Sequence, residues 1–237
     1  MRSCASVKRN SGMATRSASS PHSSLKSVVI RSMQPSVFTI GHSTESFDQL
    51  AARLQAHSVT AVADVRSSPY SRHNPQFNRE ALRNSLATRS IRYVFLGKEL
   101  GARTDDDSCY CDGKVQYERL AQTPLFQSGI DRVVEGSQTF TISLLCAEKE
   151  PLDCHRTILV SKALTERGLD VRHILIDGSV EKHDDTMHRL IEQLPISEHD
   201  MFRTPESALR EAYALQGDRI AYDRNARSSS APNPDYA

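Results

Sequence analysis

The sequence predicts an α/β fold in which a mostly parallel sheet of about five strands carries helices on both faces, a Rossmann-like three-layer arrangement. Two observations indicate it. Apolar runs of strand length alternate with segments whose apolar residues recur every three or four positions. Strands that alternate with helices need crossover connections, and these join parallel neighbours. A chain of 237 residues is the length of one domain with tails, and it can bury a sizeable core.

The first half of the domain is predicted to supply three strands and two helices. The apolar run VFTI at 37–40 is the first strand. In the segment 46–57 the apolar residues share one helix face, and Ser46 with Gln49 forms a capping box at its start. The remaining elements of this half are the strand 59–65, the helix 78–89, which Asn78 caps, and the strand 91–95.

The second half begins with residues 97–113, which have no usable period and are predicted to form a loop. Residues 115–135 are predicted to hold one or two helices, broken near Pro124. The strand 139–146 is the most apolar of all. The elements after it are a helix from Cys154 to a C-cap at Gly168, the last strand 171–176, a helix marked by Met187, Leu190, Ile191 and Leu194, and a helix 204–216 that starts with Thr204 and Pro205.

Both ends of the chain are predicted to be disordered tails around a single domain at 36–217. Residues 1–35 are rich in serine and basic residues, and no acidic residue precedes Glu45. This composition fits a mitochondrial-type transit peptide, and it also fits an extension upstream of a natural start at Met33. Residues 218–237 are predicted to be the second tail.

Composition and charge narrow the class of protein. Charged residues make up 25% of the chain and the formal net charge is +1, which does not favour a nucleic-acid partner, although a local basic groove stays open. No apolar run approaches the roughly 20 residues of a membrane-spanning helix, so no membrane partner is expected. The five cysteines are odd in number and irregularly spaced, which favours reduced thiols and a cytoplasmic location.

Polar residues follow most of the predicted strands. In an open parallel sheet, ligands bind beyond the carboxyl ends of the strands, so these residues are expected to share one rim. They are Gly41, His42 and Ser43 after the first strand; Asp64, Arg66, Ser67, Ser68, Tyr70, Ser71, Arg72 and His73 at and after the second; Cys146 and Glu148 after the fourth; and Asp177 and Gly178 after the fifth.

The stretch LLCAEKEPLDCHRTILV (144–160) places Cys154 at the start of a predicted helix. Unpaired N–H groups and the helix dipole lower a thiol pKa there, and the same groups hold anions. Cys154 is therefore predicted to be a reactive, accessible thiol. His155 is predicted to act as its base or to orient it, while Asp64 and Glu148 orient arginines or move protons. The predicted anion-binding residues are Arg66, Arg72, Arg156, Ser71, Gly41 and His42.

Plainer roles and other site chemistries also fit several of these residues. Cys146 fits a small buried hydrophobe, His42 fits a helix cap, and Asp64 fits a partner for an arginine. A phosphatase loop needs an arginine six positions after its cysteine, but Leu152 and Val160 stand there. A metal held by Cys146, Cys154 and His42 stays open. The eight-residue spacing of the cysteines gives it little support, and adjacent residues at a helix start rarely face one ion.

Six stretches in this order resemble the domain-of-unknown-function family 488: FTIGHST, DVRSSPYSRHNPQFN, YVFLGKELG, DGKVQYERL, LLCAEKEPLDCHR and VRHILIDG. The resemblance covers about residues 36–195. It implies an α/β domain but no particular activity. The positions of this chain that match the family's signature are Gly41, His42, Asp64, Arg66, Ser71, Cys146, Glu148, Cys154, His155 and Arg156.

Three functions remain open from the sequence. The leading hypothesis is an enzyme that acts on an anionic small molecule, a nucleotide or a modified base. The second is a non-catalytic module that binds a nucleotide or nucleic acid, and the third is a metal-dependent enzyme. No cofactor is assigned. The hypothesis of a reactive Cys154 predicts that it is alkylated before Cys146, with Cys4, Cys109 and Cys111 as exposed thiols of ordinary reactivity.

Overall fold

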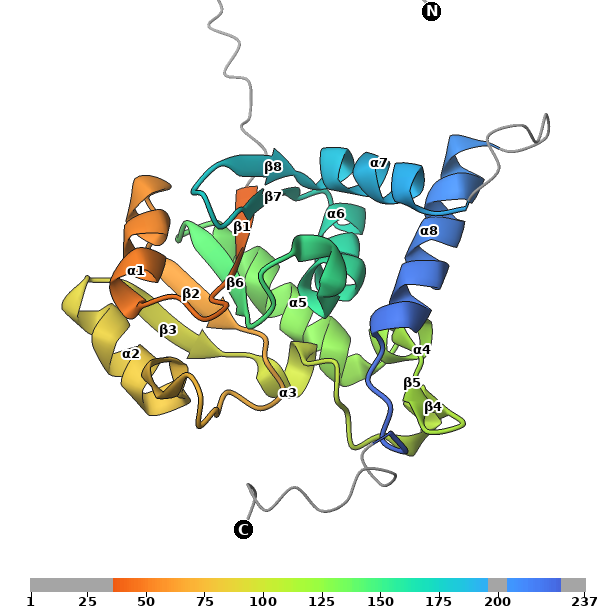
Figure 1. Ribbon diagram of the computed structural model, residues 1–237, viewed down its shortest axis with the longest axis horizontal. Helices are drawn as coiled ribbons and strands as arrows, with labels where there is room; N and C mark the ends of the chain where they lie inside the picture. Colours follow the sequence, from red (N-terminus) through yellow and green to blue (C-terminus); the bar gives the residue numbers. More distant parts are fainter. Residues whose placement is uncertain (1–35, 196–203, 227–237) are drawn as a thin grey trace, which may run out of the picture. The chain divides into compact units, whose positions relative to one another are not determined.

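The computed structural model describes residues 36–195 and 204–226, which lie in the unit Gln34–Ala237. In these residues a six-stranded sheet has the order β3-β2-β6-β1-β7-β8 (Figure 1). Its strands are β1 (Ser36–Gly41), β2 (Ala61–Asp64), β3 (Arg92–Phe95), β6 (Ile142–Cys146), β7 (Asp170–Ile174) and β8 (Val180–Lys182). All run parallel except β8, which is antiparallel to β7. The predicted mostly parallel α/β sheet is confirmed.

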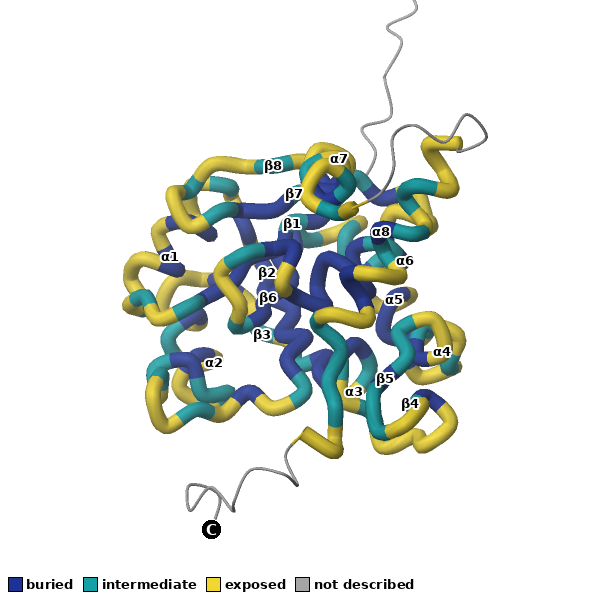
Figure 2. Tube along the Cα trace, turned by 45° about the vertical axis from the view of Figure 1, so that its right-hand side comes forward, coloured by how far each residue is buried: buried dark blue, intermediate teal, exposed yellow. Residues whose placement is uncertain are grey.

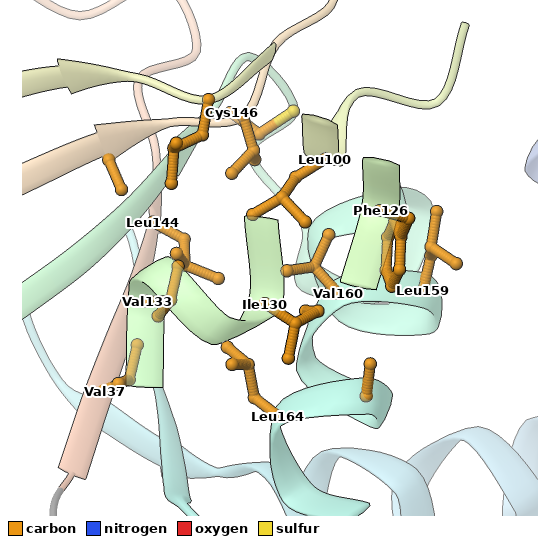
Figure 3. Close-up of a cluster of buried hydrophobic side chains, with 14 of the residues drawn as sticks. Val37, Leu100, Phe126, Ile130, Val133, Leu144, Cys146, Leu159, Val160 and Leu164 are labelled. Carbon is orange, nitrogen blue, oxygen red and sulfur yellow. The ribbon is translucent and has the colours of Figure 1, made fainter. Parts of the chain in front are cut away.

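Helices cover both faces of the sheet because its strands alternate side chains between the faces. Leu145 packs with Leu50 of α1 (Phe47–Ala56) and Leu82 of α2 (Arg79–Thr88) on one face. Its neighbour Leu144 packs on the other face, against α5 (Pro124–Ser137) and α6 (Lys162–Glu166). Figure 3 shows this second cluster, with Leu144 beside Val133 of α5. In Figure 2 the buried part of the trace runs through the central strands.

Two predictions about short elements are wrong. The strand β8, which follows the predicted last strand, pairs at the sheet edge through its backbone and has no apolar run to reveal it. The predicted loop 97–113 contains α3 (Gly97–Leu100), a 3-10 turn at Asp107–Cys109 and the strand β4 (Tyr110–Cys111). β4 pairs with β5 (Lys114–Val115) through the turn residues Asp112 and Gly113, whose φ angles are +49° and +84°. An Asp-Gly pair is a strong hairpin signal, and it lies in this sequence.

The helical segments otherwise follow the predicted boundaries, with one change of type. The break near Pro124 is confirmed, since α4 (Tyr117–Ala121) ends before it and α5 begins at it, capped by the Thr123 side chain. The predicted single helix after Cys154 divides into a π-helical turn, Arg156–Ser161, and α6. The last two helices are α7 (His183–Gln193) and α8 (Pro205–Ile220), and Thr204 caps α8 as predicted.

The domain continues beyond its predicted end at residue 217. α8 reaches Ile220, and the chain after it is held against the β4–β5 hairpin. The Val115 N–H donates to the Tyr222 carbonyl at 2.9 Å, and the Arg224 N–H donates to the Gly113 carbonyl at the same distance. The predicted disorder of residues 1–35 and 227–237 falls outside the described residues. Among the described helices, none has both the length and the apolar character needed to cross a bilayer.

Candidate functional site

The ends of β1 and β6 lie side by side at the carboxyl edge of the sheet. The His42 N–H donates to the Cys146 carbonyl oxygen at 3.1 Å, so the pairing of these strands continues past their ends. Gly41 lies against the backbone of Glu148, and a Cβ at this position would overlap the Glu148 carbonyl oxygen. The structure therefore gives Gly41 a packing role: it lets the segment after β6 approach β1.

Two thiols, an imidazole and a carboxylate meet just after β6. The Sγ atoms of Cys146 and Cys154 lie 2.8 and 3.0 Å from the same oxygen, Oε2 of Glu148. Nδ1 of His155 lies 3.7 Å from the Cys146 Sγ and 3.9 Å from the Cys154 Sγ. Both cysteines are buried, whereas Glu148 is exposed. The Glu148 carboxylate therefore links a buried pair of thiols to solvent.

The two thiols have opposite pKa shifts. Burial raises the pKa of Cys146 well above its usual value, and its neighbours Cys154 and Glu148 add to this effect. Burial also opposes a Cys154 thiolate. However, a hydrogen bond from Cys146 and the positive charges of Arg156 and His155 together lower the pKa of Cys154 well below its usual value. Cys154 is thus the thiolate of the pair, in the direction that the sequence predicts.

The accessibility that was expected of Cys154 is not found. Its residue is 1% exposed, and that of Cys146 is 2% exposed. The chain around Cys154 is extended, with φ −135° and ψ 137°, and it turns the thiol inward beneath Glu148. Of the thiols expected to be exposed, Cys111 is exposed, Cys109 is buried, and Cys4 lies outside the described residues.

A buried ion pair occupies the end of β2. Asp64 is fully buried, and it accepts hydrogen bonds from Arg66 Nε and Nη2 at 2.8 and 2.6 Å and from the Tyr93 hydroxyl at 2.7 Å. Arg66 Nη1 lies 3.1 Å from Nε2 of His42, and Nδ1 of His42 donates to the Ser43 carbonyl. Burial and the charge of Arg66 lower the pKa of His42 to about 4, so this imidazole is neutral and accepts from the guanidinium. Asp64 therefore acts here as the partner of an arginine.

The three arginines of the predicted cradle lie in different surroundings. Arg156 is fully buried, and its guanidinium donates to the carbonyl oxygens of Glu148 and Lys149 at 2.7 and 3.3 Å. In this arrangement the Arg156 guanidinium holds the backbone after β6 and does not reach solvent. Arg72 is exposed on the loop after β2, where the Ser71 hydroxyl accepts two backbone N–H groups of that loop.

The metal-ligand set is also different from the predicted one. Among the described residues, the Sγ atoms of Cys146 and Cys154 and a ring nitrogen of His155 all lie within 4.8 Å of one another. The third possible ligand is therefore His155 and not His42. Cys154 and His155 are adjacent and still face one point, because Cys154 is extended and only His155 has helical backbone angles.

The family model described as Domain of unknown function DUF488 matches residues 46–163. The chain contains a DUF488 domain. Comparisons with curated proteins and with solved structures gave no match. Cys146, Glu148, Cys154 and His155 all lie within the matched range, whereas Gly41 and His42 precede it.

A pocket of about 270 Å³ opens next to the cluster of the DUF488 domain. Cys146, Glu148 and His155 line it, while Cys154 does not. Its other lining residues are Arg66, Ser67, Ser68, Ala102, Arg103, Tyr117, Ala147, Asp153, Ile220 and Tyr222. Arg103, Tyr117 and Tyr222 were not singled out in the sequence, because Arg103 and Tyr222 lie in segments without a period and Tyr117 lies in a short helix. Ile220 and Tyr222 lie beyond the matched range, so the end of α8 and the chain after it complete the wall.

Proposed function

We propose that the protein is an enzyme that acts on an anionic small molecule of mononucleotide size or smaller, bound in the pocket beside the Cys146–Glu148–His155 surface. One observation carries the proposal: the same pocket is lined by groups able to transfer protons or bind an electrophile and by two arginines. Its volume of about 270 Å³ lies just below the range of about 300–1,000 Å³ for small-molecule sites, which favours a small ligand.

Glu148 is the group best placed to transfer a proton. It is exposed, and its Oε2 lies 2.8 Å from the Cys146 sulfur and 3.0 Å from the Cys154 sulfur. A carboxylate at the boundary between solvent and a buried thiol pair can accept a proton from a bound molecule and return it.

Arg103 is the arginine best placed to bind the anion. It is exposed, and its guanidinium lies over the Tyr222 ring at 4.6 Å from the centroid, which holds it at the pocket wall. Arg66 also lines the pocket, but Asp64 neutralises its charge. Tyr117 and Tyr222 add aromatic surface, which favours a planar ring such as a nucleobase.

Isothermal titration with AMP, CMP and inorganic phosphate tests the anion site. Arg103→Gln should raise the dissociation constant of a bound nucleotide by about 10- to 100-fold, the effect of one charge-assisted hydrogen bond. Arg92→Gln is a matched control, since Arg92 is also exposed and stacks over an aromatic ring, that of Phe140, but lies outside the pocket. Binding of none of the three anions, or equal losses in both variants, would remove the proposal.

A second measurement separates an enzyme from a binding module. A nucleotide mixture is incubated with the parent protein and with Glu148→Gln, and products are followed by mass spectrometry. The enzyme should convert one component, and the variant should bind that component but fail to convert it. Binding without conversion by the parent would show a non-catalytic nucleotide-binding module instead.

A further inference from the structure

We propose that Cys146, Cys154 and His155 hold a zinc ion. The role of this ion rests on the proposed function, because the ion would lie at the wall of the substrate pocket, but the site itself rests on geometry alone. Two sulfurs and one imidazole nitrogen are ligands that zinc accepts, and hard ions such as Mg²⁺ and Ca²⁺ prefer oxygen.

The two sulfur-to-nitrogen distances match a tetrahedral ion. Bonds of about 2.3 Å to sulfur and about 2.0–2.1 Å to nitrogen, at tetrahedral angles, place the sulfur and nitrogen atoms about 3.6 Å apart. Nδ1 of His155 lies 3.7 Å from the Cys146 sulfur and 3.9 Å from the Cys154 sulfur. An ion could therefore enter with shifts of a few tenths of an ångström.

The histidine ring is oriented for ligation. Nε2 of His155 lies 3.1 Å from the carbonyl oxygen of Val65, and because a carbonyl can only accept, Nε2 carries a proton. Nδ1, the atom that faces both sulfurs, can bind a metal once it releases the proton that gives His155 its positive charge. A ligand histidine whose other nitrogen donates to a carbonyl is the usual second-sphere arrangement of zinc sites.

The two cysteines are also supported by the surrounding chain. Cys146 ends the central strand β6, and the N–H of Arg156 points at the Cys154 sulfur at 3.4 Å. An N–H group directed at sulfur stabilises a thiolate, the form that binds metal. The buried guanidinium of Arg156, tied to the carbonyl of Glu148, adds positive charge beside the cluster.

The site is placed as a catalytic zinc site would be. Catalytic zinc has three protein ligands and one position open to substrate or water. Cys146 and His155 line the pocket, as does Glu148, whose carboxylate lies beside both sulfurs. The open position would therefore face the pocket next to Glu148. The ion would supply a Lewis acid at the pocket wall, and Glu148 is placed to accept a proton from a molecule bound there.

The metal content of the purified full chain tests the site. Elemental analysis should find about one zinc per chain after dialysis, and Cys154→Ser and His155→Gln should lose it. Cys109→Ser is the matched control, because Cys109 is a buried free cysteine outside the cluster. It should keep its zinc. Circular dichroism shows whether each variant folds.

Cobalt gives a readout that does not depend on the variants. Parent protein stripped of metal and loaded with Co²⁺ should show thiolate-to-cobalt absorption and the visible bands of a tetrahedral site. A parent that takes up neither Zn²⁺ nor Co²⁺ while its thiols are kept reduced would overturn the proposal. A protein that holds zinc but binds no nucleotide would support the zinc site and contradict the proposed function. A protein that binds a nucleotide but holds no zinc would support the proposed function and contradict the zinc site.

Discussion

Replacing Asp64 by asparagine should destabilise the fold strongly. The carboxylate is fully buried and receives three hydrogen bonds from Arg66, at 2.6, 2.8 and 3.1 Å, and one from Tyr93 at 2.7 Å. Removing its charge leaves the buried guanidinium without a counter-ion. Breaking such a pair costs about 3–5 kcal/mol. For a domain of this size each kcal/mol lowers the melting temperature by about 2–4 °C, so the expected fall is about 6–20 °C.

Differential scanning calorimetry at pH 7 measures this fall, and a graded series tests the reasoning. Tyr93→Phe removes one hydrogen bond to a charged group, worth about 1.5–3 kcal/mol, and should lower the melting temperature by less than Asp64→Asn. Asp48→Asn is the control: its ion pair with Arg89 lies at the surface and contributes under about 1 kcal/mol. If Asp64→Asn melts within about 2 °C of the parent, Asp64 is not a structural partner of Arg66, and a role in the reaction becomes the better explanation.

Three other perturbations have expected outcomes. Gly41→Ala should cost about 1–3 kcal/mol or more in urea unfolding, because its Cβ would displace the Glu148 backbone; an unchanged midpoint would contradict this packing role. Burial lowers the pKa of His183 to about 4 in the folded protein, against about 6.5 in the unfolded chain. Below pH 6.5 the unfolded chain therefore binds a proton at this histidine that the folded protein does not, and the free energy of unfolding falls by roughly 2–3 kcal/mol by pH 4.5. His183→Gln should reduce this pH dependence of the free energy of unfolding. Equal slopes against pH in parent and variant would show that His183 does not cause it. Arg224→Ala should speed hydrogen exchange at the Val115 N–H with under about 1 kcal/mol of global loss, because exposed contacts of Arg224 help to hold the chain after α8; a large global loss would show that this segment is part of the core.

Much of the fold could be predicted because local patterns and the observed structure obey the same periods. Leu144 and Leu145 lie on opposite faces of β6 because a strand alternates its side chains, and each meets a helix whose apolar face recurs every three or four residues. The helix start at Ser46 and Gln49 was visible as well, since a capping box is formed by residues three positions apart. The collection of polar residues at one edge followed from the parallel direction of the strands.

The partners of those polar residues were decided by the tertiary structure. Hydrophobic burial has no direction, so the apolar patterns are compatible with many strand orders. The order found here places β6 between β1 and β2, which brings Asp64 and Cys146 to one edge. The sequence predicted that Cys146 ends a strand at this edge and that Cys154 and His155 start the helix after it, but the spacing gave little support to a site shared by all three. The extended backbone at Cys154 decided that His155, and not His42, faces both sulfurs. The direction of a side chain depends on the φ and ψ angles of its residue and on the neighbours it packs against. Spacing along the chain fixes neither the angles nor the neighbours.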